Sequence, residues 1–214
     1  MPKWASGPTG QPTYWYRAKK ELIAADPVIA DVIKGCGRGR LVGQGDPFVT
    51  LVRSIVAQQI SVRAADSIWN RLVETAGSIS PKIVADRDEA ELQSAGLTRR
   101  KASYIRDMAV AFLEGSVAPK IWHAKDDEGV ISELVGLRGV GRWTAEMFLI
   151  FHLLRPNILP LDDIGLIRAC ERHYAAGKEM TREDIEQLAE RWKPWRSVAT
   201  WYLWRSLDPT PVAY

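Results

Sequence analysis

The chain has 214 residues, of which 46% are hydrophobic and 26% are charged, and its formal net charge at pH 7 is +3. This length allows one or two compact units with a hydrophobic core, and the composition is that of an ordinary soluble protein. No window approaches the unbroken apolar run of about 20 residues that a membrane helix needs, so membrane spanning is excluded. The mild basic excess is compatible with a polyanionic partner, but many proteins without one share it.

Cysteine and histidine usage limits the role of metals. The two cysteines, Cys36 and Cys170, form no Cys-x-x-Cys pair, which argues against a structural zinc, an iron–sulfur cluster or a disulfide framework. We expect both to be buried thiols. The three histidines, His123, His152 and His173, share no metal-ligand spacing, so we expect no metal held by side chains.

The first helix signals follow an amino-terminal arm. Residues 2–13 are rich in Pro, Gly, Ser and Thr and show no periodicity, so we interpret them as a flexible or draped arm. Asp26-Pro27 and Asp46-Pro47 each place a capping carboxylate before a proline at the first helical position, where the missing N–H costs nothing. Both pairs predict the start of a helix.

Two later segments also carry helix signals. Residues 102–113 place apolar side chains on one face and Arg106 and Asp107 on the other, a spacing that fits a helix and no strand. Thr181 with Asp184 three residues later resembles a capping box. No segment shows sustained two-residue alternation, so the predicted fold class is all-α. The apolar positions of the first segment are Ile105, Met108, Ala109, Phe112 and Leu113.

A glycine-rich turn separates two apolar periodic segments. Residues 134–145 read Leu-Val-Gly-Leu-Arg-Gly-Val-Gly-Arg-Trp-Thr-Ala, which predicts a helix, a tight turn and a second helix. Gly139 and Gly141 permit positive φ and close approach of another backbone, and the first turn of the next helix leaves amide donors without intrahelical partners. Such donors suit a phosphate, although glycine spacing alone favours an ordinary interhelical turn.

Together with its surroundings, this turn resembles that of the helix–hairpin–helix superfamily of DNA glycosylases. The family hairpin reads Leu-x-Gly-hydrophobic-Gly-x-x-Thr-Ala, matched here by residues 137–145, and members place a catalytic aspartate downstream, where residues 159–164 read Leu-Pro-Leu-Asp-Asp-Ile. Residues 57–61 (Ala-Gln-Gln-Ile-Ser) and 190–197 (Glu-Arg-Trp-Lys-Pro-Trp-Arg-Ser) are similar to the 3-methyladenine DNA glycosylase II branch in particular. The resemblance covers residues 46–207.

This resemblance implies a fold of two helical subdomains with a cleft between them. Residues 38–154 would form a central subdomain that includes the helix–hairpin–helix, and residues 1–37 with 155–214 a second subdomain from both chain ends. In this branch the second aspartate of the pair is catalytic, so the resemblance implies that Asp163 does the chemistry, and Asp162 is left to cap the helix that begins there.

The implied activity is base excision. The enzyme would flip an alkylated base of the 3-methyladenine or 7-methylguanine type out of duplex DNA and hydrolyse its glycosidic bond. Breaking the bond between C1′ and the base develops positive charge on the sugar, which the Asp163 carboxylate would stabilise while a water attacks. An alkylated purine is already cationic and leaves readily, which fits the lack of a conspicuous second acid.

Nine tryptophans are a high count, and aromatic side chains are what a flipped cationic base requires. Trp143 and Met147 lie one helical turn apart and share a face, and Trp204 matches a pocket aromatic of the family, so all three are assigned to the base pocket. We expect Trp69, Trp122 and Trp192 in the core, whereas Trp195 and Trp201 stay unassigned.

The family inserts a wedge side chain into the gap left by the flipped base. This position falls at Gln59, where relatives often carry a bulky apolar residue, so the neighbouring Ile60 is an alternative wedge. The family hairpin holds a structural cation through backbone carbonyls and contacts DNA phosphates through backbone amides. The carbonyls would be those of Val135, Leu137 and Val140; the DNA contacts would come from Gly139, Gly141 and Thr144, together with Arg142.

Relatives that also cut the DNA backbone carry a lysine two residues after the last hairpin glycine, where it forms a Schiff base. This chain has Trp143 there, so we expect a monofunctional glycosylase without lyase activity and without a cofactor other than the cation. We expect a monomer that binds double-stranded DNA with a damaged base and no membrane. Because the amino terminus lacks a secretion signal, we expect it in the cytoplasm, nucleoid-associated if the source is bacterial.

Two alternatives remain open at this point. One is a glycosylase of the same fold for uracil, thymine mismatches, hypoxanthine or oxidised purines, since pocket shape is not readable from sequence. The other is a non-catalytic DNA-binding protein that kept the hairpin. Asp163 and the pocket tryptophans argue against the second, because a mere binder needs neither.

Overall fold

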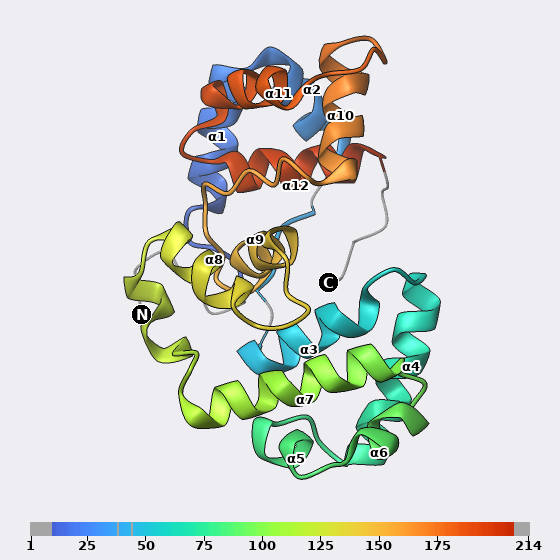
Figure 1. Cartoon of the computed structure of the whole chain (residues 1–214). Helices are drawn as coiled ribbons and strands as arrows, with labels where there is room; N and C mark the ends of the chain where they lie inside the picture. The colour runs from blue at the N-terminus through green and yellow to red at the C-terminus, as the bar shows by residue number, and fades with distance from the viewer. Residues whose placement is uncertain (1–9, 38, 44, 208–214) are drawn as a thin grey trace. The chain divides into compact units, whose positions relative to one another are not determined.

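The computed structural model describes residues 10–37, 39–43 and 45–207, and all regular elements in these ranges are helices (Figure 1). The predicted all-α class is therefore confirmed. Residues 2–9 of the predicted arm lie outside the described residues. In chain order the elements are α1 (Trp15–Ala25), α2 (Pro27–Gly35), α3 (Pro47–Ala57), α4 (Val62–Ala76), α5 (Pro81–Ala85), α6 (Glu89–Ser94), α7 (Arg99–Glu114), η1 (Pro119–Ala124), α8 (Asp127–Val135), α9 (Arg142–Phe151), α10 (Ile164–Tyr174), α11 (Arg182–Ala189), η2 (Glu190–Trp192) and α12 (Arg196–Leu207).

The predicted helix starts are confirmed, and each rests on a side-chain cap. Asp26 accepts hydrogen bonds from two amides at the start of α2, and Asp46 accepts one at the start of α3. Thr181 and Asp184 form the reciprocal bonds of a capping box at the start of α11. Such caps contribute about 1 kcal/mol each, because they satisfy amides that no helical carbonyl reaches.

The chain divides into two compact units. The end-built unit comprises the described parts of residues 1–43 and 149–213, and the central unit comprises those of residues 44–148. Each boundary lies six residues inside the predicted limits of 38 and 154. The reason at the second boundary is that α9 continues into the end-built unit, where the Leu149 carbonyl accepts from the Arg155 amide and the Arg155 carbonyl from the Ser197 hydroxyl.

The end-built unit is organised around α12, which packs against α1, α2 and α10. All residues from 197 to 204 of α12 are buried, as expected for a helix surrounded by others. Trp192 is fully buried as predicted, and the two unassigned tryptophans, Trp195 and Trp201, are also buried in this unit. Cys170 is buried as predicted, but the prediction for Cys36 is wrong, because Cys36 lines a surface depression and is only partly buried.

The central unit is organised around α7, which packs against α3, α5 and α6. A row of edge-to-face rings runs from Phe48 through Phe112 and Trp122 to Phe148, with ring centroids 5.2–6.3 Å apart, and Trp122 is fully buried as predicted. The predicted apolar stripe of α7 is buried up to Ala109, whereas Leu113 is 56% exposed near the helix end.

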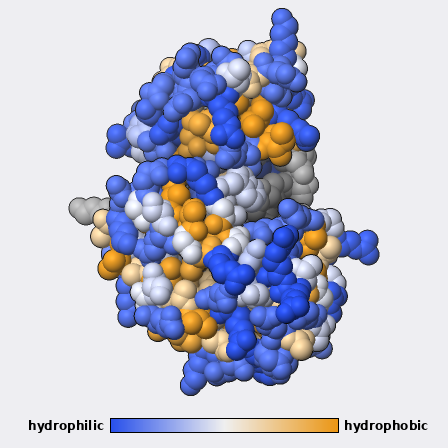
Figure 2. Space-filling view, in the orientation of Figure 1, coloured by the Kyte–Doolittle hydropathy of each residue, from blue (hydrophilic) through white to orange (hydrophobic). Residues whose placement is uncertain are grey.

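The prediction that Trp69 belongs to the core is wrong. Trp69 is partly exposed on α4, with the guanidinium of Arg53 5.6 Å from its ring centroid. On the face seen in Figure 2, the surface of each unit is mostly hydrophilic with scattered apolar residues. None of the described helices is long and apolar enough to cross a membrane.

Candidate active site

Asp163 lies in the end-built unit, where the chain turns into α10. Its backbone is extended and its side chain is only 5% exposed. Oδ1 accepts two hydrogen bonds of 2.6 Å, one from the Leu166 amide in the first turn of α10 and one from Nε1 of Trp204 on α12. Hydrogen bonds to a carboxylate are short and strong, so these two donors fix the position of Oδ1.

The structure corrects the predicted division of labour between the two aspartates. Asp163, and not Asp162, is the N-cap of α10, because it is the last residue with extended backbone and its side chain bonds the amide three residues on. Asp162 lies one position before the cap and is exposed, and it forms an ion pair with Arg182 of α11. The candidate catalytic carboxylate is therefore also a structural cap.

Trp204 contacts Asp163 directly. Its ring stacks on that of Phe151 at the end of α9, with centroids 5.7 Å apart and an interplanar angle of 12°. A Cβ on Gly165 would lie 3.0 Å from both Asp163 Oδ1 and Trp204 Cδ1, so glycine leaves room for the bond between them. Sequence reasoning missed Phe151 and Gly165. Helical spacing offered a signal for Phe151, because it lies one turn after Met147.

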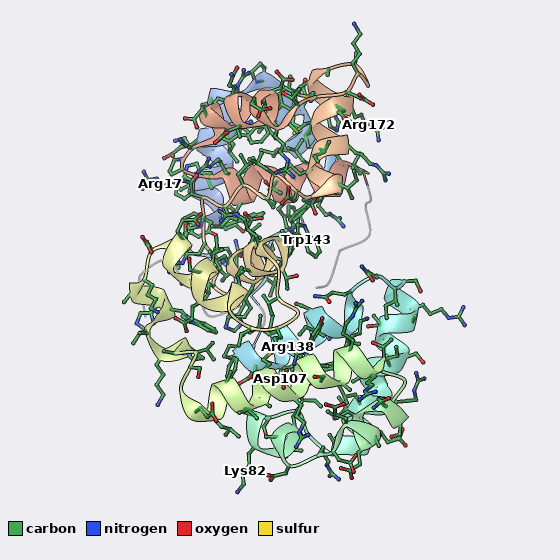
Figure 3. All side chains as sticks on the ribbon, in the orientation of Figure 1. Arg17, Lys82, Asp107, Arg138, Trp143 and Arg172 are labelled. Carbon is green, nitrogen blue, oxygen red and sulfur yellow. The ribbon has the colours of Figure 1, made fainter. Side chains whose placement is uncertain are left out.

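The other two predicted pocket residues lie on α9. Trp143 is partly exposed in the first turn, and Met147 is buried one turn later, at spacing that puts both on one face of the helix. Trp143 is labelled in Figure 3. Their contact with a flipped base stays a prediction.

The predicted helix, turn and helix are confirmed as α8, residues 136–141 and α9. Gly139 has φ +86°, and a Cβ there would lie 2.2 Å from the ring of Tyr104, so the close approach requires glycine but involves a side chain and not a backbone. Gly141 differs from Gly139 in both respects, while its contact with DNA stays a prediction. Its φ is not positive, and a Cβ there would meet no described atom within 4 Å.

The turn presents amides suited to a phosphate. The first main-chain bond of α9 runs from the Ala145 amide to the Gly141 carbonyl at 3.0 Å, so the amides before it, that of Thr144 included, precede the helical hydrogen-bond pattern. Within the described residues, the amides of Gly139 and Gly141 also donate to no main-chain carbonyl. A surface depression of about 510 Å³ adjoins the turn. It is lined by Gln58, Gln59, Arg100, Lys101, Tyr104 and residues 135–141.

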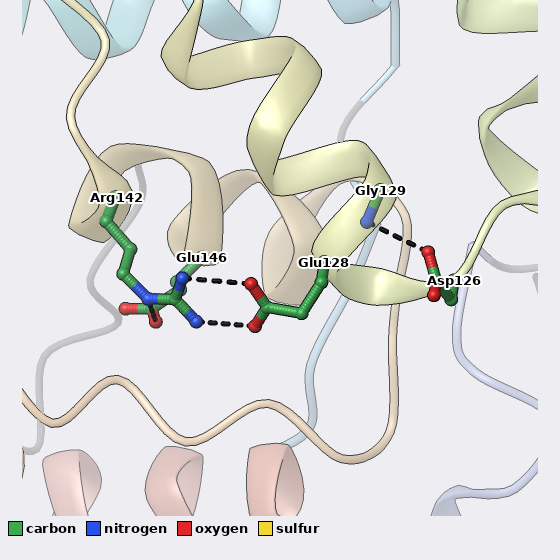
Figure 4. Close-up of polar contacts among 5 residues, drawn as sticks. All are labelled: Asp126, Glu128, Gly129, Arg142 and Glu146. Carbon is green, nitrogen blue, oxygen red and sulfur yellow. Dashed lines mark hydrogen bonds and ion pairs between the residues drawn. The ribbon is translucent and has the colours of Figure 1, made fainter.

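Arg142, a predicted DNA contact, is engaged by two carboxylates (Figure 4). Its guanidinium donates two bonds to Glu128, at 2.5 and 3.0 Å, and a third to Glu146 at 3.1 Å. The bonds to Arg142 lower the pKa of Glu128. Asp126 caps α8 through the Gly129 amide, which places Glu128 in the first turn of that helix. A phosphate that reaches Arg142 must therefore compete with Glu128.

The candidate wedge, Gln59, lies in an exposed bend between α3 and α4. It has φ +59°, a left-handed conformation that costs a residue other than glycine about 1–2 kcal/mol. Ile60, the alternative wedge, is 39% exposed in the same bend. Sequence reasoning missed two neighbours: Gln58, whose Nε2 donates to the Gly139 carbonyl at 2.9 Å, and Lys101, which contacts the end of α3.

The carbonyls proposed for a structural cation fit such an ion chemically. Val135 ends α8, so its carbonyl is among the last of that helix, where the helix dipole favours positive charge. Leu137 accepts a bond from the Val140 amide at 3.1 Å, and a carbonyl retains a second lone pair for a cation. In the described residues, no group of His, Cys, Asp and Glu side chains could hold a metal instead.

The sequence of this chain is similar to those of known proteins. Residues 52–194 match the model of a family described as HhH-GPD superfamily base excision DNA repair protein. The chain is 30% identical to the alkylbase DNA glycosidase-like protein mag2 of Schizosaccharomyces pombe, over 88% of this chain and 92% of that protein. It is also 30% identical to the putative DNA-3-methyladenine glycosylase YfjP of Bacillus subtilis, over 74% of this chain and only 58% of that protein.

Solved structures agree. The chain superimposes on DNA-3-methyladenine glycosidase from Bacillus halodurans with a TM-score of 0.82 and 30% identity, covering 89% of each chain. The 3-methyladenine DNA glycosylase Mag1 of Schizosaccharomyces pombe, in complex with abasic DNA, gives a TM-score of 0.80 at 27% identity, over 92% of this chain and 100% of that one. The protein therefore belongs to the HhH-GPD superfamily of base excision DNA repair proteins, in the branch of the 3-methyladenine DNA glycosylases.

Proposed function

We propose that this protein is a monofunctional DNA glycosylase that flips alkylated bases of the 3-methyladenine and 7-methylguanine type out of duplex DNA and hydrolyses their glycosidic bonds. The observation that carries the proposal is the Asp163 carboxylate, which is buried and fixed through Oδ1 by two donors. A helix cap needs only the amide of Leu166; the indole of Trp204 adds a second constraint from another helix. The names of the relatives support alkylated bases as the substrate class.

Asp163 would act as the anion that stabilises the positive charge of the sugar as the bond between C1′ and the base breaks. A preorganised carboxylate suits this role because it does not have to reorient when the charge develops. The same carboxylate would orient the attacking water. Trp143, Met147 and Trp204 would bind the flipped base, and cation–π contacts with its positive charge contribute about 0.5–2 kcal/mol.

The enzyme would have no lyase activity. A Schiff base requires an amine near C1′, and the position two residues after Gly141 carries the indole of Trp143. Strand breaks should therefore appear only when alkali cleaves the abasic sites that the enzyme leaves.

Double-stranded DNA would be bound through the hairpin. The amides of Gly139, Gly141 and Thr144 would contact phosphate, and Arg142 would join them after exchange with Glu128. A monovalent cation held by residues 135, 137 and 140 would add positive charge beside the phosphate. We further propose a monomer that acts on chromosomal DNA in the cytoplasm, nucleoid-associated if the source is bacterial.

The test is base release from methylated duplex DNA by the wild type, Asp163→Asn and Asp162→Asn. We expect 3-methyladenine release by the wild type and by Asp162→Asn, none by Asp163→Asn at unchanged duplex binding, and strand breaks only after alkali. Asp26→Asn is a matched control, because Asp26 is also a buried helix cap bonded by an indole, that of Trp192. Equal losses for Asp162→Asn and Asp163→Asn would refute the catalytic assignment, and release of uracil or oxidised purines alone would refute the substrate class.

A further inference from the structure

One face of α7 holds two loops of the central unit. Lys101, Tyr104 and Asp107 are spaced three residues apart and so lie on the same side of the helix. Lys101 contacts the end of α3, while Tyr104 lies against Gly139 in the hairpin turn. Asp107 accepts a 2.6 Å bond from Arg138 of the same turn, and both are labelled in Figure 3. The bend that carries Gln59 and the hairpin turn therefore share one support.

Lys101 replaces hydrogen bonds that the end of α3 lacks. Its Nζ donates to the Val56 carbonyl at 2.8 Å and to the Gln58 carbonyl at 2.7 Å. Carbonyls at the end of a helix have no amide partner and carry the negative end of its dipole, so an ammonium is a favourable donor there. Burial lowers the pKa of Lys101, as expected for an amine withdrawn from water.

Gln58, the residue before the candidate wedge, is held through both its main chain and its side chain. The carbonyl of Gln58 is bound by Lys101, and its side-chain amide donates to the Gly139 carbonyl at 2.9 Å. Gln59 follows directly, with left-handed backbone and an exposed side chain. A left-handed conformation outside glycine persists only where the surroundings enforce it, and the bonds to Gln58 are the constraint that adjoins it.

We propose that Lys101 is a positioning residue for base flipping: its ammonium fixes the end of α3 so that the side chain of Gln59 enters the duplex as the wedge. The inference rests on the proposed function and deepens it. Lys101 itself touches neither the base nor the sugar in this role. Its loss should therefore impair the opening of a paired duplex much more than the chemistry on a base that is already unpaired.

The test compares two substrates that differ only in the cost of flipping. 7-Methylguanine is placed either opposite cytosine in a duplex or in an unpaired bulge, where extrusion costs less. For Lys101→Met, the single-turnover rate of release should fall roughly tenfold or more on the paired substrate and less than about twofold on the bulge. Lys82→Met is the control, because Lys82 is an exposed lysine on α5 of the same unit and is labelled away from Arg138 in Figure 3.

Two further measurements keep the outcome decisive. Gln59→Ala should remove most of the Lys101→Met effect on the paired substrate, because residues that act through one another are not additive. Lys101→Arg, which keeps a cation, should restore the ratio of the two rates. Equal rate losses on both substrates, or additive losses in the double variant, would overturn the proposal and leave Lys101 a residue of general stability.

Failure of the proposed function would be seen separately. If the wild type releases no alkylated base from either substrate, the proposed activity is refuted. Base flipping can still be measured in that case, because the fluorescence of 2-aminopurine in a duplex rises when this base leaves the stack. A fluorescence rise with the wild type that is lost in Lys101→Met and kept in Lys82→Met supports the positioning role. A rise of the same size in all three proteins overturns it.

Discussion

Replacement of Trp204 by phenylalanine tests how the Asp163 carboxylate is held. The ring that stacks on Phe151 would be retained in part, but the indole N–H that donates to Oδ1 at 2.6 Å would be lost. The amide of Leu166, in the first turn of α10, would still donate to Oδ1. The carboxylate should keep its place at the cap but gain freedom to rotate about it.

The expected loss of rate follows from the strength of the hydrogen bond between Trp204 and Asp163. A hydrogen bond to a charged group contributes about 1.5–3 kcal/mol. If that constraint is needed in the transition state, the rate of base release should fall roughly 10- to 150-fold, since about 1.4 kcal/mol corresponds to a factor of ten. Single-turnover release of 3-methyladenine, with enzyme in excess, measures this rate without interference from product release.

Trp192→Phe is the matched control. Trp192 is also a buried tryptophan of the end-built unit, and its indole donates to Oδ2 of Asp26, a helix cap, at 3.0 Å. Both substitutions should lower the free energy of unfolding by about 1–3 kcal/mol through lost packing and one lost bond. Only Trp204→Phe should slow base release by folded enzyme. A rate within about twofold of wild type for Trp204→Phe, or equal rate losses in both variants, would refute the argument.

Three further results are expected. Gly139→Ala should lower the free energy of unfolding by at least about 1 kcal/mol in urea titrations, because of its positive φ and the ring of Tyr104, whereas Gly141→Ala should change it by less than about 0.5 kcal/mol. Glu128→Gln should tighten binding of undamaged duplex and steepen its salt dependence, because the guanidinium it holds is released to phosphate; unchanged affinity would contradict this. Burial alone would raise the pKa of Glu133, but hydrogen bonds from a lysine, a backbone amide and an indole outweigh burial and lower it. The stabilisation by Glu133 is therefore complete above the usual pKa of 4.5 and is lost as pH falls through the lowered value. Glu133→Gln should consequently make the melting temperature fall less steeply with decreasing pH in this range.

Local patterns in the sequence were enough for the predicted helix starts, for α7 and for the hairpin. The caps at Asp26, Asp46 and Thr181 act within three residues, so their partners are visible in the same stretch of chain. The spacing of apolar residues likewise repeats within a few turns. The motif of the turn and the aspartates pointed to the glycosylase family, and the family model confirms it.

The sequence-based assignment of Asp162 as the helix cap was wrong. Both Asp162 and Asp163 stand before α10, and the outcome depends on which of them has extended backbone beside the first helical turn. Asp162 instead pairs with Arg182, a residue of another helix. Because the competing partners lie in different helices, only the folded unit shows which aspartate meets which donor.

By itself, then, the sequence determined the all-α class, the helix starts, the turn with Gly139 and the identity of the candidate carboxylate. Only the tertiary structure showed that Trp204 donates to Asp163 and that Lys101 holds the end of α3. The physical reason is range: helix propensity and capping are satisfied between near neighbours, whereas these bonds join residues 41 and 45 positions apart, which no local pattern encodes.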